Sequence, residues 1–212
     1  MEFDEKKVPE MEAETGVEAE QEIEEKVVEK KPPLLKRFWK EWGDVVILLA
    51  AIFVVFKLFL QIAWVPTGSM ETTIPARTVQ LGWQLPYRLG DPVPKRGDVI
   101  TFWSDECGEV LVKRAIGLPG ETVSFAGGCV YIEGEKLEED YLPIPGLTES
   151  PMESFTVPEG CVFFMGDNRT GSFDARFWQD HYIPVEELQA KVLLTISVGK
   201  NHSWTGFRLI TK

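Results

Sequence analysis

A serine and a lysine occupy the two segments of this sequence whose residue types are best suited to chemistry. Ser69 lies in Pro-Thr-Gly-Ser-Met, residues 66–70, and Lys113 begins Lys-Arg-Ala-Ile-Gly-Leu-Pro-Gly. A serine hydroxyl is a weak nucleophile at neutral pH and needs a base within hydrogen-bond reach, which in most hydrolases is histidine. The two histidines, His181 and His202, stand in no recognisable motif. We therefore expect Ser69 to be a nucleophile and Lys113 to be its base.

The proposed base must be neutral before it can accept a proton. The pKa of a lysine is ordinarily about 10.4, and burial in apolar surroundings lowers it. Lys113 follows Leu111 and Val112 in a segment with the composition of a strand. We therefore expect its amine to be buried. Because a buried lysine destabilises the folded state at neutral pH, a purely structural role would be a poor reason for burying it.

The serine follows the long apolar run of the chain, Val45–Val65. As a helix these 21 residues would span roughly 31 Å, which matches a hydrocarbon core of about 30 Å. Trp39 and Trp42 precede the run and Trp64 lies near its end, as in an interfacial aromatic belt. The run is longer than the apolar part of a secretory signal. We expect an uncleaved transmembrane helix over residues 45–65.

The flanks of this run predict its orientation. Residues 34–44 form a basic and aromatic juxtamembrane segment, and positive charge on this side places the amino end in the cytoplasm. Residues 1–33 are expected to be a disordered acidic cytoplasmic tail, because residues 1–31 hold twelve acidic residues against five lysines and few apolar ones. The tail accounts for −7 of the net charge of −12. The tail has no basic residues interleaved with aromatic ones, which argues against a nucleic-acid partner.

Residues 66–212 are expected to form an extracytoplasmic catalytic domain made mainly of β-strands. Short segments rich in Val, Ile, Phe and Thr alternate there with Gly and Pro turns. Residues 185–189 are expected to form a helical turn and residues 138–158 an irregular surface loop. The expected strands are 99–103, 110–116, 122–125, 129–132, 161–165 and 191–198.

The cysteines and histidines do not predict a metal site. Cys107, Cys129 and Cys161 are 22 and 32 residues apart and form no Cys-x-x-Cys pair. We expect neither a metal nor a cofactor. An oxidising exterior would allow one disulfide among the three, with three possible pairings, but a role as small buried hydrophobic residues is favoured for Cys129 and Cys161.

Taken together, the motifs resemble a known family. The serine segment, the lysine segment and Gly-Asp-Asn-Arg at residues 166–169 occur in this order after an amino-terminal anchor, which closely resembles bacterial type I signal peptidase over about residues 45–200. The resemblance implies coiled antiparallel sheets, a place in the bacterial cell membrane and no cofactor. It also implies that the substrates are secretory preproteins cut after small residues at the first and third positions before the bond. The oligomeric state stays open.

The resemblance also assigns roles at matching positions. It makes Ser69 the acylating nucleophile and Lys113 the general base, with the Thr67 hydroxyl beside the Ser69 N–H as an oxyanion hole. Ser172 would orient Lys113. The supporting ion pairs would be Asp174 with Arg176 and Asp167 with Arg114.

A substrate wall is expected beside these groups. An extended peptide presents alternate side chains to one side, which explains a rule on the first and third positions. Val65, Pro66 and Val112 flank the reacting groups and are expected either to form this shallow apolar wall or simply to pack in the core. Three departures from the family pattern concern turn geometry: Thr72 stands in place of the usual proline, Glu121 in place of aspartate, and Gln179 in place of glycine.

The sequence favours this function over three others. A self-cleaving repressor with the same Ser/Lys chemistry would carry a DNA-binding helix-turn-helix instead of a membrane span. A peptidase of the endoplasmic-reticulum type would have histidine at position 113. A membrane-tethered β module that only binds partners would not need Ser69, Lys113, Ser172 and Asp174 together.

Overall fold

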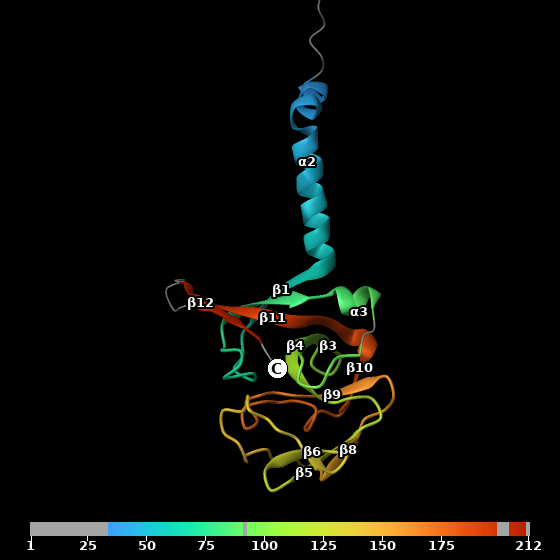
Figure 1. The fold of residues 1–212 in the computed structure, drawn as a ribbon, viewed down its shortest axis with the longest axis vertical. Coiled ribbons are helices and arrows are strands. Elements are labelled where there is room, and N and C mark those ends of the chain that lie inside the picture. The colour runs from blue at the N-terminus through green and yellow to red at the C-terminus, as the bar shows by residue number, and fades with distance from the viewer. Residues whose placement is uncertain (1–33, 91–92, 199–203, 211–212) are drawn as a thin grey trace, which may run out of the picture. The chain divides into compact units, whose positions relative to one another are not determined.

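The computed structural model describes residues 34–90, 93–198 and 204–210 (Figure 1). The acidic tail expected over residues 1–33 therefore lies outside the described residues. The described part is mainly antiparallel β-structure preceded by one apolar helix, which confirms the expected fold class.

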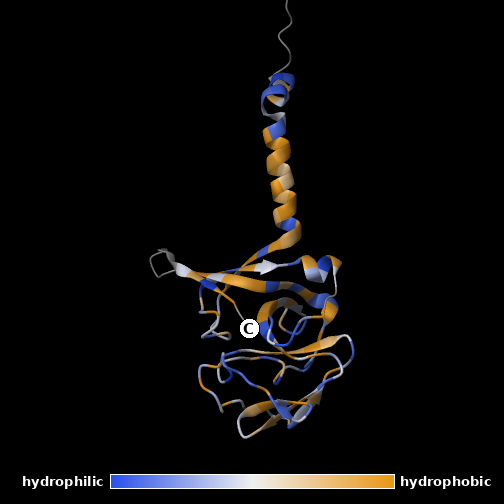
Figure 2. Cartoon of the chain, in the orientation of Figure 1, coloured by the Kyte–Doolittle hydropathy of each residue, from blue (hydrophilic) through white to orange (hydrophobic). Residues whose placement is uncertain are grey.

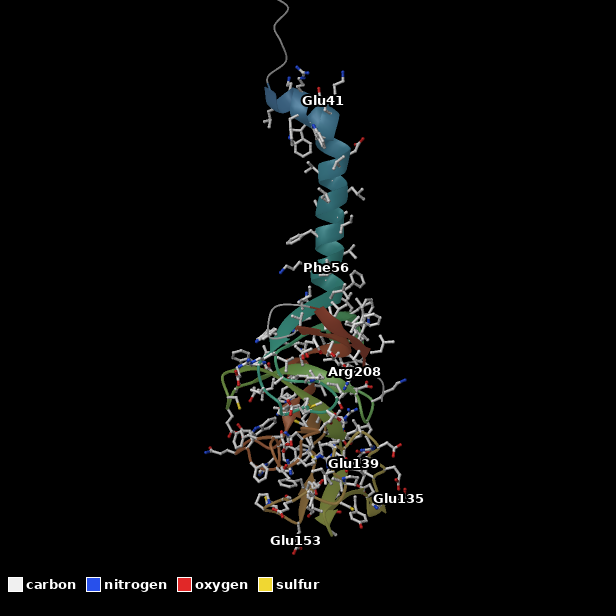
Figure 3. The ribbon with its side chains drawn as sticks, turned by 90° about the vertical axis from the view of Figure 1, so that its left-hand side faces the viewer. Glu41, Phe56, Glu135, Glu139, Glu153 and Arg208 are labelled. Atoms are coloured by element: carbon white, nitrogen blue, oxygen red, sulfur yellow. The ribbon has the colours of Figure 1, made fainter. Side chains whose placement is uncertain are left out.

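Helix α2 spans Leu34–Phe59. Its stretch Leu35–Phe59 is long and apolar enough to cross a membrane. The apolar residues occupy most of the helix (Figure 2), and their side chains are exposed, Phe56 among them (Figure 3). A helix with an apolar surface needs an apolar environment around it, which a bilayer provides.

The helix differs from the expected span at both ends. It begins at Leu34 and so includes the whole segment expected to be juxtamembrane, residues 34–44, and it ends at Phe59 instead of Val65. Residues Leu60–Val65 form strand β1, which pairs with β2 at six positions, from Leu60 opposite Trp83 to Val65 opposite Thr78. Strand pairing overrides the helical continuation here, because a continuous apolar run does not by itself distinguish a helix from a strand.

A large antiparallel sheet holds the functional segments. In the described residues it has eight strands in the order β1-β2-β11-β3-β4-β9-β10, with β12 against β11. Strand β11 pairs with β3 near its start and with β2 and β12 further along, so the sheet coils around this long strand (Figure 1). The bounds are β1 Leu60–Val65, β2 Thr78–Trp83, β3 Val99–Ser104, β4 Glu109–Gly117, β9 Cys161–Met165, β10 Ile183–Pro184, β11 Leu188–Val198 and β12 Trp204–Leu209.

A smaller antiparallel sheet has the order β7-β6-β5-β8 among the described residues. Gly117 ends β4 and a turn leads from it into β5, so the chain passes from the large sheet to the small one just after the lysine segment. The remaining bounds are β5 Thr122–Ala126, β6 Cys129–Ile132, β7 Glu135–Lys136, β8 Ser154–Thr156, helix α3 Leu85–Leu89 and the 3-10 turn η1 Val185–Glu187.

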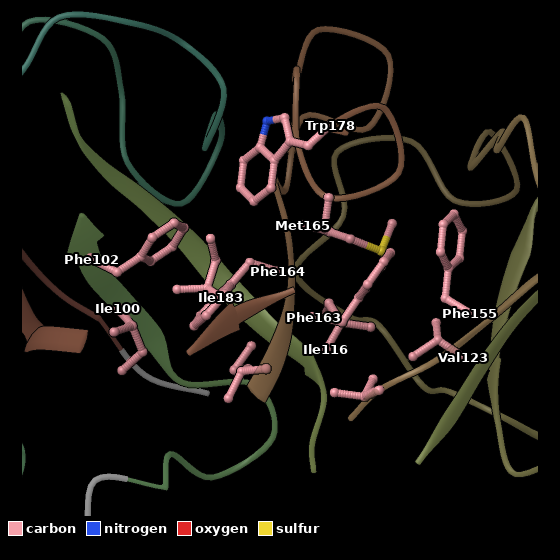
Figure 4. Close-up of a cluster of buried hydrophobic side chains, with 14 of the residues drawn as sticks. Ile100, Phe102, Ile116, Val123, Phe155, Phe163, Phe164, Met165, Trp178 and Ile183 are labelled. Atoms are coloured by element: carbon pink, nitrogen blue, oxygen red, sulfur yellow. The ribbon is translucent and has the colours of Figure 1, made fainter. Parts of the chain in front are cut away.

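Two apolar clusters stabilise this arrangement. The larger lies between the sheets and contains Phe102 stacked on Phe164 with ring centroids 4.4 Å apart (Figure 4). The smaller lies beneath the serine segment and consists of Val65, Met70, Ile74, Val99, Val112 and Val192. Strand β4 contributes to both clusters, which explains why its second half is buried on both faces.

All six expected strands are present, whereas β1, β2, β7, β8, β10 and β12 are not among the expected strands. Strand β2 shows why such a strand escapes prediction. Its apolar residues do not form its buried face: Thr78, Gln80 and Gly82 are more buried than the Val, Leu and Trp that alternate with them. A search for alternating apolar residues cannot find such a strand. The expected irregular loop over residues 138–158 contains strand β8, and the helical turn expected over 185–189 is the shorter η1.

Candidate active site

A groove of about 460 Å³ contains both residues expected to react. The end of β1 and the chain that follows it form one side, and the first half of β4 forms another. The lining residues are Ala63, Trp64, Val65, Pro66, Thr67, Ser69, Gln80, Cys107, Glu109, Val110, Leu111, Val112, Lys113, Gly171 and Phe173. Most of this wall is apolar, so a charged amine opening into it is poorly solvated.

The serine segment follows β1 directly and is held from below. Met70 and Ile74 are fully buried, and the Ile74 N–H donates to the Met70 carbonyl at 2.8 Å. The Arg77 N–H donates to the Val65 carbonyl at 2.8 Å, which closes the loop at its base. Ser69 is therefore presented on a loop whose two ends are fixed.

The Gly-Asp-Asn-Arg loop holds the serine segment from the side. Asn168 donates from its backbone N–H to the Ser69 carbonyl at 3.1 Å and from its side-chain amide to the Gly68 carbonyl at 3.1 Å. Asn168 was not assigned a role from the sequence, although it stands in a recognised motif. Its contacts bridge about a hundred residues of sequence, so only the fold reveals them.

Gly166 makes this close approach possible. A Cβ atom at this position would lie 2.2 Å from Ser172 Oγ and 2.5 Å from the Ser69 carbonyl oxygen. Any side chain would therefore separate the two loops that carry the serines. This glycine is required for steric reasons, independently of its backbone angles.

Lys113 lies in β4 and is 3% exposed. Its Nζ donates to Ser172 Oγ at 3.0 Å, the contact that the family resemblance implied. Strand β9 ends at Met165 opposite Arg114, so the loop after β9 begins beside this point and brings Ser172 to the amine. Burial lowers the pKa of Lys113 to about 8, although the nearby Asp174 carboxylate opposes the shift.

Asp174 is bonded to Arg176 instead of Lys113. Arg176 Nε donates to Asp174 Oδ1 at 2.8 Å and Nη2 to Oδ2 at 2.9 Å, and both residues are buried. Asp174 Oδ2 also accepts the Gly166 N–H at 2.9 Å. The carboxylate is thus shared between a cation and the backbone. Among the described residues, no carboxylate lies within ion-pair distance of the Lys113 amine.

Arg114 and Asp167 form a second buried pair. Arg114 Nε donates to Asp167 Oδ1 at 2.8 Å and Nη2 to Oδ2 at 2.6 Å, while Nη1 donates to the Gly97 carbonyl at 2.7 Å. The Tyr141 ring lies 3.8 Å from the guanidinium carbon. Thr73 donates to Asp167 Oδ2 at 2.5 Å, which links the pair to the serine segment.

Sequence reasoning missed two of these partners. Thr73 follows Thr72, the residue that replaces the usual proline. Thr73 itself matches the family pattern, and it is the residue that contacts Asp167. Tyr141 lies in the expected irregular loop, where no sequence signal points to Arg114. Arg169 from the same motif donates to Thr148 at 2.8 Å and pairs with Glu139, which fixes this loop against the site.

The other two departures from the family pattern have local partners. Glu121 accepts from Arg96 Nη1 at 2.8 Å and from the Leu118 N–H at 2.7 Å. Burial acts to raise the pKa of Glu121, but these hydrogen bonds outweigh it and the pKa lies below its ordinary value. The Gln179 N–H donates to Glu106 Oε2 at 2.8 Å. Both turns are closed without aspartate or glycine.

The residues expected to form the oxyanion hole and the substrate wall all line the groove. Thr67 and Pro66 are exposed, whereas Val65 and Val112 are buried. Val65 and Val112 also belong to the smaller apolar cluster, so the two expected roles, wall and core, coexist.

The histidines and cysteines contribute little to the groove. His181 Nδ1 lies 2.6 Å from the Ala175 carbonyl and the residue does not line the groove, while His202 lies outside the described residues. All three cysteines are free, and Cys107 is the one that lines the groove.

Comparison with known proteins gives a consistent result. Residues 39–197 match the family described as signal peptidase, peptidase S26. A probable signal peptidase I-2 of Synechocystis sp. is 29% identical over 164 residues, covering 74% of this chain and 72% of that protein. Signal peptidase I of Bacillus licheniformis is 32% identical over 167 residues, covering 72% and 83%. A crystal structure of a signal peptidase I from Enterococcus faecalis is 35% identical, covers 46% of this chain and 95% of that one, and has a TM-score of 0.40.

Proposed function

This chain belongs to the signal peptidase family, peptidase S26, a family of serine endopeptidases, and we propose that it removes signal peptides with Ser69 as nucleophile and Lys113 as base. The observation that carries the proposal is the state of Lys113. Its amine is buried, opens into the groove that Ser69 lines, and is bonded to a neutral hydroxyl instead of a carboxylate.

The lowered pKa makes Lys113 competent as a base. At a pKa of about 8, about a tenth of the amine is neutral at pH 7. At its ordinary value of 10.5, fewer than about one molecule in a thousand would be neutral at that pH. Burial thus raises the reactive fraction by more than about a hundredfold.

The reaction would proceed through an acyl-enzyme. Ser69 Oγ attacks the carbonyl carbon of the scissile bond while Lys113 Nζ takes the hydroxyl proton. The carbonyl oxygen becomes an oxyanion, which the Ser69 N–H and the Thr67 hydroxyl stabilise. Lys113 then gives its proton to the leaving nitrogen, and the carbon–nitrogen bond breaks. Lys113 then takes a proton from water, whose oxygen attacks the ester carbonyl carbon. Lys113 returns this proton to Ser69 Oγ as the ester carbon–oxygen bond breaks, which releases Ser69 and the carboxylate product.

The supporting residues keep this geometry in place. Ser172 accepts the hydrogen bond from Lys113 and fixes the direction of its amine. Asp174, paired with Arg176, accepts the Gly166 N–H and so fixes the backbone at Gly166. Because Ser172 packs directly against Gly166, this also keeps Ser172 close to Lys113. The pair of Asp167 and Arg114 holds Thr73, and so the serine segment, through Asp167.

The substrate would enter as an extended peptide between the end of β1 and β4. Alternate side chains of such a peptide face one wall, and Val65 and Val112 form a shallow apolar surface beside the reacting groups. A small residue fits there without displacing the cluster beneath it. This supports cleavage after small side chains at the first and third positions before the bond.

The apolar helix supports a membrane location for this peptidase. We propose that α2 crosses the bacterial cell membrane with its basic amino-terminal flank in the cytoplasm and with residues from Leu60 onward outside. Ser69 follows the last residue of the helix by ten positions. The nucleophile would therefore stay near the outer side of the cell membrane, where the signal peptides of exported preproteins emerge.

Cleavage of a preprotein tests this function. The full chain in detergent micelles is expected to release a mature protein from a secretory preprotein, with sequencing of the new amino terminus placing the cut after a small residue. Ser69→Ala is expected to abolish release, whereas Ser150→Ala, at a loop residue that does not line the groove, is expected to leave it unchanged. Binding of preprotein by the wild-type protein without cleavage would identify a binding module instead.

A further inference from the structure

Gln80 is a buried polar residue in the wall of the groove. It lies in β2, is 2% exposed and lines the groove together with Ala63 and Val65. Its side-chain oxygen Oε1 has no hydrogen-bond partner. A buried acceptor without a partner is costly and uncommon, so a donor from the groove that reached this oxygen would gain a hydrogen bond that the protein itself does not supply.

Two other polar side chains on the same face of the sheet have partners. Thr78, two residues before Gln80, donates to the Pro75 carbonyl. Gln61 accepts from Thr101 at 2.6 Å and donates to Gln189 at 2.9 Å. Not every buried polar group on this face lacks a partner, and among the residues that line the groove Gln80 is the one with an unpartnered buried oxygen.

A second unpartnered oxygen lies next to Gln80. Thr195 of β11 stands directly opposite Gln80 in the strand register, is 1% exposed, and its Oγ1 also lacks a partner. Opposed residues in an antiparallel pair have side chains on the same face, about 5 Å apart. The wall of the groove thus has a local polar position behind an otherwise apolar surface.

The position of Gln80 along the groove corresponds to one substrate residue. On its other side, β2 places Gln80 opposite Ala63 and Thr78 opposite Val65. Ala63 and Val65 are two residues apart on β1, which is about 6.6 Å, the spacing of alternate side chains in an extended peptide. If the first residue before the bond packs near Val65, close to Ser69, the third residue falls near Ala63 and Gln80.

We propose that Gln80 makes this peptidase prefer a hydroxyl side chain, threonine or serine, at the third position before the scissile bond. The substrate hydroxyl donates to Gln80 Oε1 and supplies the missing hydrogen bond. Because a hydroxyl both donates and accepts, it fits either orientation of the Gln80 amide. A valine of the same shape fills the space but leaves the oxygen unpaired. The inference rests on the proposed function, since it assigns a specificity to the same groove.

Two peptides that differ only at this position test the preference. Each carries alanine at the first position before the bond, and the third is threonine in one and valine in the other. We expect the full chain in detergent to cleave the threonine peptide with a kcat/KM about 3 to 10 times higher, the range that one neutral hydrogen bond supplies. Gln80→Met removes the acceptor at similar volume and is expected to abolish the preference or reverse it.

A matched control distinguishes an effect of the groove from the effect of replacing any buried glutamine. Gln84 is also buried with an unpartnered Oε1, but it does not line the groove. Gln84→Met is therefore expected to keep the wild-type ratio of the two rates. Gln80→Ile, with a β-branched side chain suited to a strand, provides a second test if Gln80→Met folds poorly.

The possible results distinguish the threonine preference from the peptidase activity itself. Equal cleavage of both peptides by the wild-type protein would overturn the preference while leaving the peptidase intact. A threonine preference that persists in folded Gln80→Met or Gln80→Ile would remove the assignment to Gln80. Absence of cleavage of either peptide, and of the preprotein, would overturn the proposed function and the preference together.

Discussion

Strand β4 carries two adjacent buried cations, Lys113 and Arg114, on opposite faces. On one face Arg114 meets a carboxylate, a backbone carbonyl and an aromatic ring. On the other face Lys113 meets the hydroxyl of Ser172, and burial lowers its pKa to about 8. Burial alone therefore does not determine whether a cation of this strand pairs with a carboxylate, since both side chains are buried.

The difference between the two cations lies in which residue each nearby carboxylate is hydrogen-bonded to. Asp167 is bonded to Arg114 and Asp174 to Arg176, each through two hydrogen bonds. The arginines hold both carboxylates near the site and leave the lysine with a neutral partner. Since arginine stays charged under all ordinary conditions, it suits this task, whereas lysine can lose its proton. Arg114 and its partners are therefore suited to stabilising the fold, whereas Lys113 is suited to accepting and donating a proton.

The largest effect should come from removing the reacting pair. Ser69→Ala, Lys113→Met and the double variant are expected to lose kcat/KM by a similar factor, on the order of a thousandfold or more, because members of one catalytic unit are not additive. The measurement is preprotein cleavage by each purified variant. Lys191→Met, which removes a partly exposed lysine paired with Asp98, is the control and should stay active. Losses that multiply in the double variant would separate Ser69 from Lys113.

Removing the other cation should affect stability more than chemistry. Arg114→Met leaves Asp167 buried without its partner and is expected to lower the free energy of unfolding by about 3 to 5 kcal/mol. Chemical denaturation in detergent, followed by tryptophan fluorescence, measures this loss. Arg96→Met disrupts a partly exposed pair with Glu121 and should lose less. A loss at Arg114 no greater than at Arg96 would contradict the structural role of that face.

Removing Lys113 should have the opposite sign. Its pKa of about 8 in the folded state lies below 10.5, so between these values the unfolded state binds more protons and wild-type stability rises with pH. Below pH 8 the penalty is complete. Lys113→Met is therefore expected to be more stable than wild type at pH 7, by at most about 3 kcal/mol, with the gain fading toward pH 10.5. Denaturation at pH 6.5, 8 and 9.5 checks this, and a difference independent of pH would exclude a lowered lysine pKa.

The smallest of these effects should come from the hydroxyl that faces Lys113. Ser172→Ala removes the hydrogen bond to Nζ and is expected to lower kcat by about 10- to 100-fold with little change in KM, because the amine loses its orientation. Steady-state kinetics on one peptide measures both constants. A rise in KM at unchanged kcat would mean that Ser172 binds substrate instead of positioning the base.

The sequence was sufficient for parts of this account. Ser69 and Lys113 stand in segments with recognisable residue types, and strands such as β3 and β9 are mainly β-branched and aromatic or apolar residues flanked by turns. Strand β2 was not predictable, because Gln80 and its neighbours put polar residues on the buried face. The end of α2 at Phe59 was missed because strand pairing, not composition, decides it.

The contacts between distant segments were not predictable from one sequence. Asn168 holds Gly68 and Ser69, and Tyr141 covers Arg114, through proximity that only the coiled sheet creates. The unpartnered oxygen of Gln80 has no sequence signature at all, since it depends on what surrounds the side chain. Residue types indicated which chemistry was available, and the fold decided which carboxylates each cation meets.

The pH dependence of kcat/KM tests the central claim most directly, because it reports the ionisation of groups in the free enzyme. With Lys113 as base, kcat/KM on one peptide is expected to rise between pH 6 and 10 with an inflection near pH 8. Folding is checked at each pH. An inflection near 6.5, the ordinary pKa of histidine, that disappears in His181→Ala while Lys113→Met stays active would contradict the account.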